Sequence, residues 1–457
     1  MKQTRLFGTD GIRGIAGEYP LDQHHVSLIG RALGQFLQRS RSGLAAPSPE
    51  PRVLIGEDTR ESSRWIAETL AAGLAQEEVV AVSAGVIPTA GIAYLSRRDD
   101  FAAGLMISAS HNPYRDNGIK VFVHSGYKLP DEGELEVEEN IFRLAPGPVQ
   151  APAALRLVED ATLRARYEDF LCSLVPPGTD FKKLRIVVDC ANGAASAIAP
   201  ELFRRLGAAV VALHASPDGR NINLGCGSLD TAGLQARVPA EAADLGVAFD
   251  GDADRALFAT ARGSLVDGDG VLYLAARHML AEGRLAGRLV VGTVMANLGL
   301  ELALGSLGLR LVRTPVGDKY VLEEMLRSGT NLGGEQSGHI IFSDHHTTGD
   351  GLLTALQVMQ IMVRTGSPLD ELVSDLKVCP QVLRNVPVRE KVPIERLPEV
   401  AAAIRASQEY FGHKGRVVVR YSGTEPLARI MVEAPDEAEV RSHAETIAAA
   451  FQRALGA

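Results

Sequence analysis

Three short aliphatic runs, each ending in small or acidic residues, recur along this chain of 457 residues, at 53–58, 186–189 and 289–293. A brief apolar run bounded in this way is typical of a fully buried parallel strand. Each run is followed by helix-compatible sequence and then by a second strand candidate, at 79–82, 209–213 and 309–312. The repeated strand, helix, strand pattern predicts three related α/β domains.

An unusual polar loop follows the third strand candidate of each predicted domain. The three loops span 108–112, 250–255 and 333–339. In open α/β sheets, ligands bind beyond the carboxyl ends of the strands. Equivalent loops from three domains therefore predict one shared cleft.

The C-terminal part of the chain has a different pattern. It predicts a helix, two strands around a polar loop and a second helix, at 397–411, 416–420, 428–433 and 437–455. The simplest interpretation is a small α+β domain. The predicted fold class is therefore α/β, with three similar mixed-sheet domains and a C-terminal α+β domain around a central cleft. The expected domain bounds are 1–153, 154–256, 257–374 and 375–457.

The composition limits the partners that we expect. The formal net charge is -9 and no run of basic residues occurs, so neither nucleic acid nor a membrane is an expected partner. The four cysteines form no C-x-x-C pair, which suggests neither a zinc site nor a disulfide framework and fits reduced thiols in the cytoplasm. No signal-peptide core and no apolar run of membrane-spanning length is present, so we expect a soluble, non-exported protein.

Three carboxylates recur at every second residue in the loop that follows the second domain's third strand candidate, at Asp250, Asp252 and Asp254. In an extended segment they share one side, where a hard divalent cation can draw them together. An EF-hand does not fit, because the sixth and twelfth positions, counted from Asp250, hold Arg255 and Ala261. A solvated acidic turn is the alternative interpretation.

The loop around Ser110 offers a hydroxyl nucleophile beside the imidazole of His111. A hydrolase nucleophile elbow needs glycine two residues to either side, but Ser108 and Asn112 stand there. Mg²⁺ beside a hydroxyl is suited to phosphoryl transfer. In the alternative, Ser110 only caps a helix and His111 is structural.

Two further loops carry candidate ligand-binding groups. Near the C-terminus, two guanidinium groups, two hydroxyls and a glycine turn together suit the oxygens of a phosphate, at Arg420, Ser422, Gly423, Thr424 and Arg429. The alternative there is an ordinary hairpin with solvated arginines. In the third domain, Glu335, Ser337 and His339 lie among glycines and either bind sugar hydroxyls or form a tight turn.

The sequence contains no phosphate-binding G-x-x-x-x-G-K-[ST] segment and no G-x-G-x-x-G fingerprint after a strand. No nucleotide pocket is therefore expected. A metal and a hydroxyl without a nucleotide site suggest that the protein itself carries the phosphoryl group, while a separate clamp holds a second phosphate. These features favour a phosphosugar mutase.

Four segments closely resemble the signature loops of the α-D-phosphohexomutase superfamily, at 108–113, 250–255, 334–339 and 420–426. The match spans the whole chain. The segments 7–14, 334–339 and 347–351 look most like the bacterial branch that acts on glucosamine phosphates. The resemblance implies a fourth domain of TATA-binding-protein-like fold. It also implies interconversion of glucosamine 6-phosphate and glucosamine 1-phosphate for cell-wall precursor synthesis.

The resemblance also implies roles for individual residues. Ser110 would be phosphorylated, and Mg²⁺ would bind a phosphoserine oxygen together with Asp250, Asp252 and Asp254. Arg255 would assist near the transferred group, and Glu335 and Ser337 would hold sugar hydroxyls. The candidates for the general acid and base are Lys120, His111 and Arg13, and Asp318 in the loop 317–320 is a further site residue.

A phosphosugar substrate and Mg²⁺ are thus the expected ligands, with glucosamine 1,6-bisphosphate or glucose 1,6-bisphosphate as activator. A homodimer is left open. Three alternatives also stay open: a phosphomannomutase/phosphoglucomutase of the same superfamily, a non-catalytic sugar-phosphate-binding protein, and a Mg²⁺-dependent phosphatase. The intact Ser110 and aspartate triplet argue against the binding protein.

Overall fold

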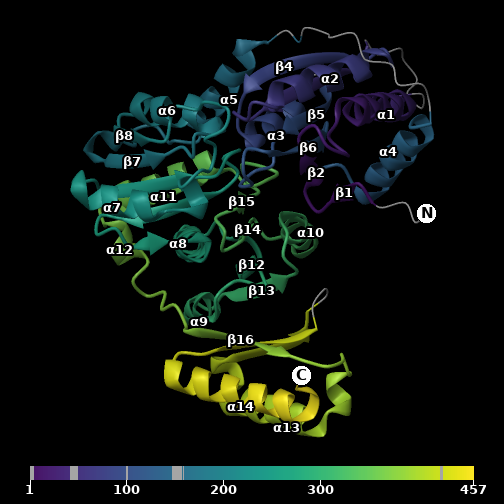
Figure 1. Ribbon diagram of the computed structural model, residues 1–457. Helices are drawn as coiled ribbons and strands as arrows, with labels where there is room; N and C mark the ends of the chain where they lie inside the picture. Colours follow the sequence, from purple (N-terminus) through teal and green to yellow (C-terminus); the bar gives the residue numbers. More distant parts are fainter. Residues whose placement is uncertain are drawn as a thin grey trace. The chain divides into compact units, whose positions relative to one another are not determined.

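The computed structural model describes residues 5–41, 50–98, 101–146, 157, 159–422 and 426–456 (Figure 1). The chain divides into two compact units. The first consists of Met1–Val294 and Val312–Val373, and the second of Met295–Leu311 and Ser374–Ala457. No helix in the described part of the chain is long and apolar enough to cross a bilayer.

The first sheet of the large unit is a mixed sheet of six strands in the order β1-β2-β6-β5-β3-β4. The strands are β1 (Phe7–Gly8), β2 (Gly11–Ile15), β3 (Arg52–Glu57), β4 (Val80–Val86), β5 (Phe101–Ile107) and β6 (Asp116–Val123). Strand β3 runs parallel to β4 and β5, whereas β6 runs antiparallel to β5 and β2. The parallel strands deliver their carboxyl ends to one edge, and β6 returns from that edge beside them.

Four helices accompany this sheet: α1 (Gln23–Arg41), α2 (Ser63–Ala75), α3 (Thr89–Arg98) and α4 (Asp131–Leu144). Helices α1 and α2 approach so closely that a Cβ on Gly73 would lie 2.3 Å from the carbonyl oxygen of Ser27. Only glycine fits at such a contact. The core between these helices and the sheet is aliphatic and includes Ile29, Leu70 and Ile107.

The second sheet has five strands in the order β11-β10-β9-β7-β8. They are β7 (Arg185–Asp189), β8 (Ala209–Leu213), β9 (Leu245–Phe249), β10 (Ala256–Thr260) and β11 (Leu265–Val266). Its helices are α5 (Ala161–Ser173), α6 (Ala199–Arg205) and α7 (Ala232–Ala240), with short 3₁₀ turns η1 (Phe181–Lys183), η2 (Ala194–Ala197) and η3 (Gly227–Leu229). Because β10 and β11 pair antiparallel beyond β9, the expected domain bound at 256 falls at the start of β10, inside this sheet.

The third sheet has the order β13-β12-β14-β15. Its strands are β12 (Leu289–Thr293), β13 (Arg310–Thr314), β14 (Leu332–Gly334) and β15 (Ile340–Phe342). Around it lie α8 (Gly268–Ala281), η4 (Ala286–Arg288), α10 (Asp318–Ser328), α11 (Gly351–Thr365) and α12 (Leu369–Leu372). The strand β14 ends at Gly334, so the loop that begins with Glu335 again follows a parallel strand.

The smaller unit contains a three-stranded antiparallel sheet in the order β16-β18-β17. Its elements are α9 (Leu298–Ser306), β16 (Gln381–Pro387), η5 (Ile394–Arg396), α13 (Pro398–Phe411), η6 (Gly412–Lys414), β17 (Arg416–Tyr421), β18 (Leu427–Glu433) and α14 (Glu437–Leu455). Helices α13 and α14 cover one face of this sheet (Figure 1). Val386, Ile430 and Phe451 belong to the core between them. The expected class of three α/β domains and one α+β domain is confirmed.

Candidate active site

Ser110 lies in the tight turn that joins β5 to β6, so it does not cap a helix. Its φ of 51° is in the left-handed region, and its side chain is buried. The backbone N–H of Ser110 donates to Oγ of Ser108 at 2.9 Å, and that hydroxyl in turn donates to Oδ2 of Asp58 at 2.6 Å. Side-chain hydrogen bonds thus fix a turn whose conformation is uncommon for serine.

Two side chains far away in the sequence hold the carbonyl groups of this turn. Nη2 of the buried Arg60 donates to the carbonyls of Ser110 and Asn112, at 2.9 Å each. Nδ2 of Asn223 donates to the same two carbonyls at 2.9 and 3.2 Å. The sequence reasoning missed both residues, although the position of Arg60 two residues after a buried strand-end aspartate was a usable signal.

The aspartate triplet follows β9, and one carboxylate oxygen from each of Asp250, Asp252 and Asp254 lies within 4.8 Å of the others. The hydroxyl of Ser110 donates to Oδ2 of Asp250 at 2.5 Å. Among the described residues, Oδ1 of Asp252 and Oδ1 of Asp254 are buried and accept no hydrogen bond. Buried carboxylate oxygens without donors, next to a third carboxylate and a hydroxyl, fit a hard divalent cation.

Lys120 projects from β6 into the triplet and is fully buried. Its Nζ lies 2.8 Å from Asp252 Oδ2, 3.2 Å from Asp254 Oδ2 and 3.1 Å from Asp10 Oδ2. Burial lowers the pKa of Lys120, but Asp10 and then Asp252 raise it more, so that it stays well above its ordinary value. Lys120 is therefore an ammonium ion that offsets part of the triplet's negative charge.

The pKa values within the triplet diverge. Burial and then the charges of Asp254 and Asp252 raise the pKa of Asp250 well above its ordinary value. Burial also raises the pKa of Asp254, but Lys120 and His339 lower it more, so that it ends well below. Asp250 thus has less compensating positive charge around it than Asp254 has. A bound cation would supply that charge.

One cavity of about 350 Å³ is lined by residues from all three α/β domains, including Arg13, His111, Arg255, Asp318, Glu335 and His339. Nδ1 of His111 lies 3.4 Å from the hydroxyl of Ser110. Burial, Arg255 and Arg13 lower the pKa of His111 to about 4, so its imidazole is neutral at neutral pH. The expected shared cleft thus corresponds, within the large unit, to a cavity with two guanidinium groups and a neutral imidazole in its wall.

The third-domain loop places its three candidates differently. Oε1 of Glu335 accepts from the backbone N–H of Gly317 at 3.1 Å, and Glu335 lines the cavity. Nε2 of His339 accepts from the N–H of Gly349 at 3.1 Å, which puts the ring proton on Nδ1, 3.6 Å from Asp254 Oδ1. Ser337 is not part of the lining, and its hydroxyl is buried without a partner among the described residues.

Asp318 connects the third domain to the first through Lys128, whose side chain is 21% exposed. Nζ of Lys128 donates to Oδ2 of Asp318 at 2.5 Å and also to Oδ1 of Asp10. Burial lowers the pKa of Lys128, but the charges of Asp10 and Asp318 raise it by more, so that the pKa lies above its ordinary value. The sequence reasoning named Asp318 but missed Lys128 and Asp10, which join it to Lys120 in one chain of alternating charges.

The C-terminal clamp candidates lie in the smaller unit. Arg420 on β17 and Arg429 on β18 are directly opposite each other in the antiparallel register, so their side chains leave the same face. Two guanidinium groups on one face of the sheet suit the binding of an anion. Lys391 adds a third cation, since its Nζ donates to the carbonyl of Ser422 at 2.7 Å. Gly423 and Thr424 lie outside the described residues.

Four family descriptions match successive parts of the chain. They are the phosphoglucomutase/phosphomannomutase alpha/beta/alpha domains I, II and III, over residues 4–146, 170–263 and 267–378, and the phosphoglucomutase/phosphomannomutase C-terminal domain over residues 383–450. These matches cover most of the chain.

Curated relatives are similar over nearly their whole length. The chain is 54% identical to the phosphoglucosamine mutase of Solibacter usitatus, with 99% of each chain covered. It is 52% identical to that of Koribacter versatilis, over 99% of this chain and 97% of the relative.

Solved structures with lower sequence identity share the fold. A phosphoglucomutase/phosphomannomutase family protein from Burkholderia thailandensis superposes with a TM-score of 0.78 at 22% identity, covering 99% of this chain and 98% of the other. The N-acetylphosphoglucosamine mutase of Aspergillus fumigatus, in complex with GlcNAc-6P and magnesium, gives a TM-score of 0.66 at 20% identity, over 98% and 96% of the two chains.

Proposed function

The chain belongs to the phosphoglucomutase/phosphomannomutase family, among its phosphoglucosamine mutases, and from this premise we propose that it interconverts glucosamine 6-phosphate and glucosamine 1-phosphate through a phosphorylated Ser110. The observation that carries the proposal is the hydrogen bond of 2.5 Å from the Ser110 hydroxyl to Asp250. Beside it, Oδ1 of Asp252 and Oδ1 of Asp254 are buried and accept no hydrogen bond from a described residue. A hydroxyl beside carboxylates that could hold a cation supports the assignment of Ser110 as the nucleophile.

In the proposed reaction, a phosphoryl group passes from Ser110 to the free hydroxyl of a bound monophosphate. The bond between phosphorus and Ser110 Oγ breaks, a bond to the sugar oxygen forms, and the sugar hydroxyl gives up its proton. The bisphosphorylated sugar then turns over, and its other phosphoryl group returns to Ser110. The second phosphate needs a binding site that accepts either end, and Arg420, Ser422, Gly423, Thr424 and Arg429 are the proposed residues.

The charges around Ser110 support different roles for the neighbouring side chains. Lys120 is a buried ammonium and Arg13 is a guanidinium, so neither starts as a base at neutral pH. The neutral imidazole of His111, 3.4 Å from Ser110 Oγ, is the candidate that can accept the proton. Arg255 lines the same cavity, and we assign it the neutralisation of charge on the transferred group.

We assign the cation to Mg²⁺, held by Asp250, Asp252, Asp254 and a phosphoserine oxygen on Ser110. Bound there, it would draw charge away from the serine oxygen as the phosphoryl group leaves. Glu335, Ser337, His339 and Asp318 are the proposed contacts for the sugar. Of these, Glu335, His339 and Asp318 line the cavity, whereas Ser337 does not.

The remaining assignments follow from the same proposal. Glucosamine 1,6-bisphosphate or glucose 1,6-bisphosphate would prime Ser110, and the product would feed cell-wall precursor synthesis in the cytoplasm. The domain bounds 1–153, 154–256, 257–374 and 375–457 stay a proposal. The second sheet suggests one change, in which the second domain extends to the end of β11.

A direct test compares the 1-phosphates of glucosamine, glucose and mannose, with the matching 1,6-bisphosphate present, and measures formation of each 6-phosphate. A clear preference for mannose or glucose would replace the proposed substrate by the phosphomannomutase/phosphoglucomutase alternative. Inorganic phosphate as the main product would favour the phosphatase.

The phosphoryl carrier is tested separately by intact mass before and after phosphatase treatment. The wild type should gain one phosphoryl group on incubation with the bisphosphate, and Ser110→Ala should gain none and lose activity. The matched control is Ser96→Ala, since the Ser96 hydroxyl is also buried and, among the described residues, donates to the carbonyl of Ile92 within its own helix. An active Ser110→Ala variant would overturn the mechanism.

A further inference from the structure

A second group of metal-ligating side chains lies at the ends of strands β7 and β8, apart from the aspartate triplet. It consists of Asp189, His214 and Cys226, which present a carboxylate oxygen, a ring nitrogen and a sulfur within 4.8 Å of one another. Asp189 ends β7, His214 follows β8, and Cys226 immediately precedes η3. Because the three come from separate segments, the spacing of the cysteines in the sequence gave no sign of them.

Asp189 is a buried carboxylate with little charge compensation. Its Oδ1 accepts from the N–H of Ala191 at 2.9 Å and its Oδ2 from the N–H of Gly227 at 3.1 Å. Within the described part of the chain, its ion-pair partner is His214, whose Nδ1 lies 3.0 Å from Oδ2. A buried carboxylate is ordinarily paired with a cation or bound to a metal.

Cys226 is held against this carboxylate by a close backbone contact. A Cβ on the next residue, Gly227, would lie 2.5 Å from both the Cβ of Ala191 and the carbonyl oxygen of Phe249. Gly227 also has a φ of 71°, so glycine is required there. A dication bound to the sulfur would take it as a thiolate and displace its proton to solvent.

We propose that Asp189, His214 and Cys226 form a second metal site, which binds zinc or a similar transition-metal dication with water in the fourth position. Ligand atoms at about 2.0–2.3 Å from a tetrahedral zinc lie roughly 3.3–3.7 Å apart, so small side-chain rotations suffice. Sulfur and imidazole select such ions over Mg²⁺, whereas the all-oxygen triplet selects Mg²⁺.

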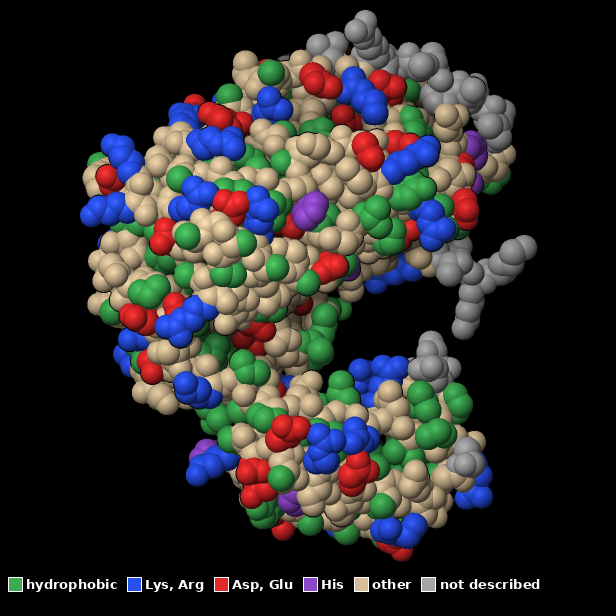
Figure 2. All heavy atoms as spheres, turned by 60° about the vertical axis from the view of Figure 1, so that its left-hand side comes forward, with side chains coloured by type: hydrophobic (Ala, Val, Ile, Leu, Met, Phe, Trp, Pro, Cys, Tyr) green, Lys and Arg blue, Asp and Glu red, His purple; other side chains and the backbone are tan. Residues whose placement is uncertain are grey.

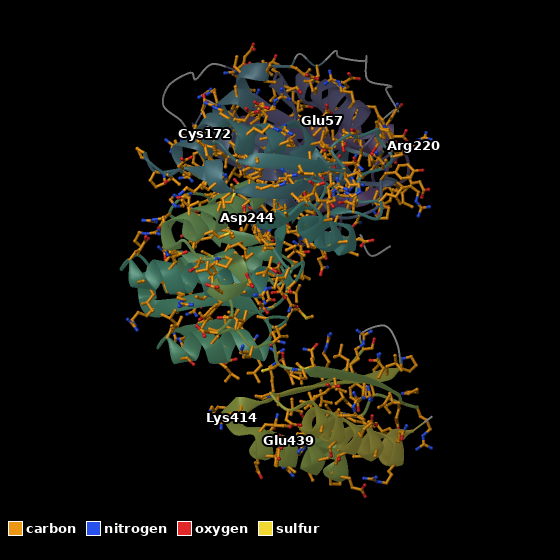
Figure 3. The ribbon with its side chains drawn as sticks, turned by 90° about the vertical axis from the view of Figure 1, so that its left-hand side faces the viewer. Glu57, Cys172, Arg220, Asp244, Lys414 and Glu439 are labelled. Atoms are coloured by element: carbon orange, nitrogen blue, oxygen red, sulfur yellow. The ribbon has the colours of Figure 1, made fainter. Side chains whose placement is uncertain are left out.

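The access route and the place of the site suggest its role. The side chain of His214 is 38% exposed, so an ion can enter from solvent. The segment between His214 and Cys226 carries Asn223, which donates to the carbonyls of Ser110 and Asn112. Its Arg220, labelled in Figure 3, pairs with Glu61 at 2.8 Å. An ion that joins His214 and Cys226 to β7 therefore fixes both ends of the segment that supports the Ser110 turn.

Cobalt provides the test, because a cobalt–thiolate bond gives a charge-transfer band in the near ultraviolet that oxygen ligands do not produce. Chelator-stripped protein is titrated with Co²⁺, and one thiolate band per chain is expected. Cys226→Ser should abolish the band, and His214→Gln should weaken Co²⁺ binding more than about tenfold. The matched control is Cys190→Ser, which removes a buried thiol next to Asp189 but outside the cluster and should keep the band.

Thermal unfolding with Zn²⁺ gives an independent readout. Zn²⁺ should raise the unfolding midpoint of the stripped wild type and of Cys190→Ser, and should leave that of His214→Gln unchanged. Absence of a thiolate band in the folded wild type, or its persistence in Cys226→Ser, would overturn the proposal. If Cys226→Ser fails to fold, His214→Gln decides, because its side chain is exposed and an unchanged affinity there excludes the site. Neither readout depends on mutase activity.

Discussion

Asp58 in the first domain and Asp252 in the second are both buried aspartates just beyond the carboxyl end of a parallel strand, but they differ in how their oxygens are used. Both oxygens of Asp58 accept hydrogen bonds, from the N–H and Nε of Arg60 and from the hydroxyls of Ser63 and Ser108. Oδ2 of Asp252 accepts from Thr89 and Lys120, while its Oδ1 accepts from no described residue.

The difference separates a carboxylate whose two oxygens both accept hydrogen bonds from one with a buried oxygen that could bind a metal ion. Asp58 has four donors, which leaves little capacity for a cation, and its bonds organise Arg60 and Ser108 around the Ser110 turn. Oδ1 of Asp252 is buried and accepts no hydrogen bond from a described residue. Burying a carboxylate oxygen in this way costs folding free energy unless a ligand binds it. Burial and position at a strand end do not distinguish the two residues, whereas the count of donors does.

The largest expected effect is on catalysis, from Asp252→Asn. The amide oxygen can still accept from Thr89 and Lys120, so we expect the fold to persist, but a charged cation ligand is lost. Activity should fall about 10³-fold or more, the equivalent of several kcal/mol of charge stabilisation. Steady-state rates and Mg²⁺ affinity by calorimetry provide the measurement, and activity within tenfold of wild type would show that Asp252 is no metal ligand.

Asp58→Asn should act on stability instead. It leaves the buried guanidinium of Arg60 without its counter-charge, which costs about 3–5 kcal/mol. Urea unfolding followed by circular dichroism measures this loss. The matched control is Asp169→Asn, because the Asp169–Arg205 pair is exposed and should contribute less than about 1 kcal/mol. Equal losses in the two variants would mean that burial does not set the strength of the pair.

Glu57, labelled in Figure 3, is a third case at the same strand end as Asp58. Its Oε2 is buried with no partner among the described residues, and burial, opposed by Arg64, raises its pKa to about 7. The neutral form is thus favoured in the folded state. The contribution of Glu57 to folding stability is fully present below its unfolded-state pKa of 4.5 and is lost as the pH rises through its folded-state pKa of about 7.

Glu57→Gln should therefore stabilise the protein at pH 8, by about 2 kcal/mol, and have little effect near pH 4.5. Thermal midpoints of wild type and variant at the two pH values give the comparison. Equal differences at both values would indicate that Glu57 is ionised in the same way in the folded and unfolded chains.

The smallest expected effect comes from Thr89→Val, which removes one of the two donors to Asp252 while keeping the side-chain shape. One hydrogen bond contributes about 0.5–1.5 kcal/mol, so activity should fall by no more than about tenfold. Thr69→Val is the control, since in the described part of the chain that hydroxyl donates to the carbonyl of Trp65 within α2. A loss as large as that of Asp252→Asn would show that Thr89 is needed to hold the metal loop.

Strand and helix positions followed largely from local pattern. The runs at 53–58, 186–189 and 289–293 became β3, β7 and β12, because a continuous apolar run is the pattern of a strand buried on both faces. Strand β16 was missed because exposed residues alternate with Val382 and Val386, in a strand with one solvated face. Strands β10 and β11, which extend the second sheet, were also not predicted as part of it.

The chemistry of the site was less accessible. The sequence and the family resemblance named Ser110, the aspartate triplet, Lys120 and His111, and their roles remain predictions. The long-range partners could not be read from the chain, because Lys120 reaches Asp252 over 132 residues and Asn223 reaches Ser110 over 113. Such pairings depend on how the domains assemble, which no local pattern encodes.

On the face shown in Figure 2, basic and acidic side chains are interspersed, and hydrophobic side chains are scattered between them. The formal net charge of the sequence is -9. Any anionic ligand must therefore be recognised by locally placed groups such as Arg13 and Arg255 in the cavity wall.

The anchoring of the Ser110 turn through main-chain carbonyls has a consequence for the catalytic cycle. Arg60 and Asn223 donate these hydrogen bonds to the main-chain carbonyl groups of Ser110 and Asn112, and none of the four bonds involves the serine hydroxyl. In the proposed reaction, the hydroxyl would gain and lose a charged group of several atoms in each turnover while the backbone beneath it keeps the same supports. The same scaffold would then serve both proposed covalent forms, and alternation between them would require no refolding of the loop.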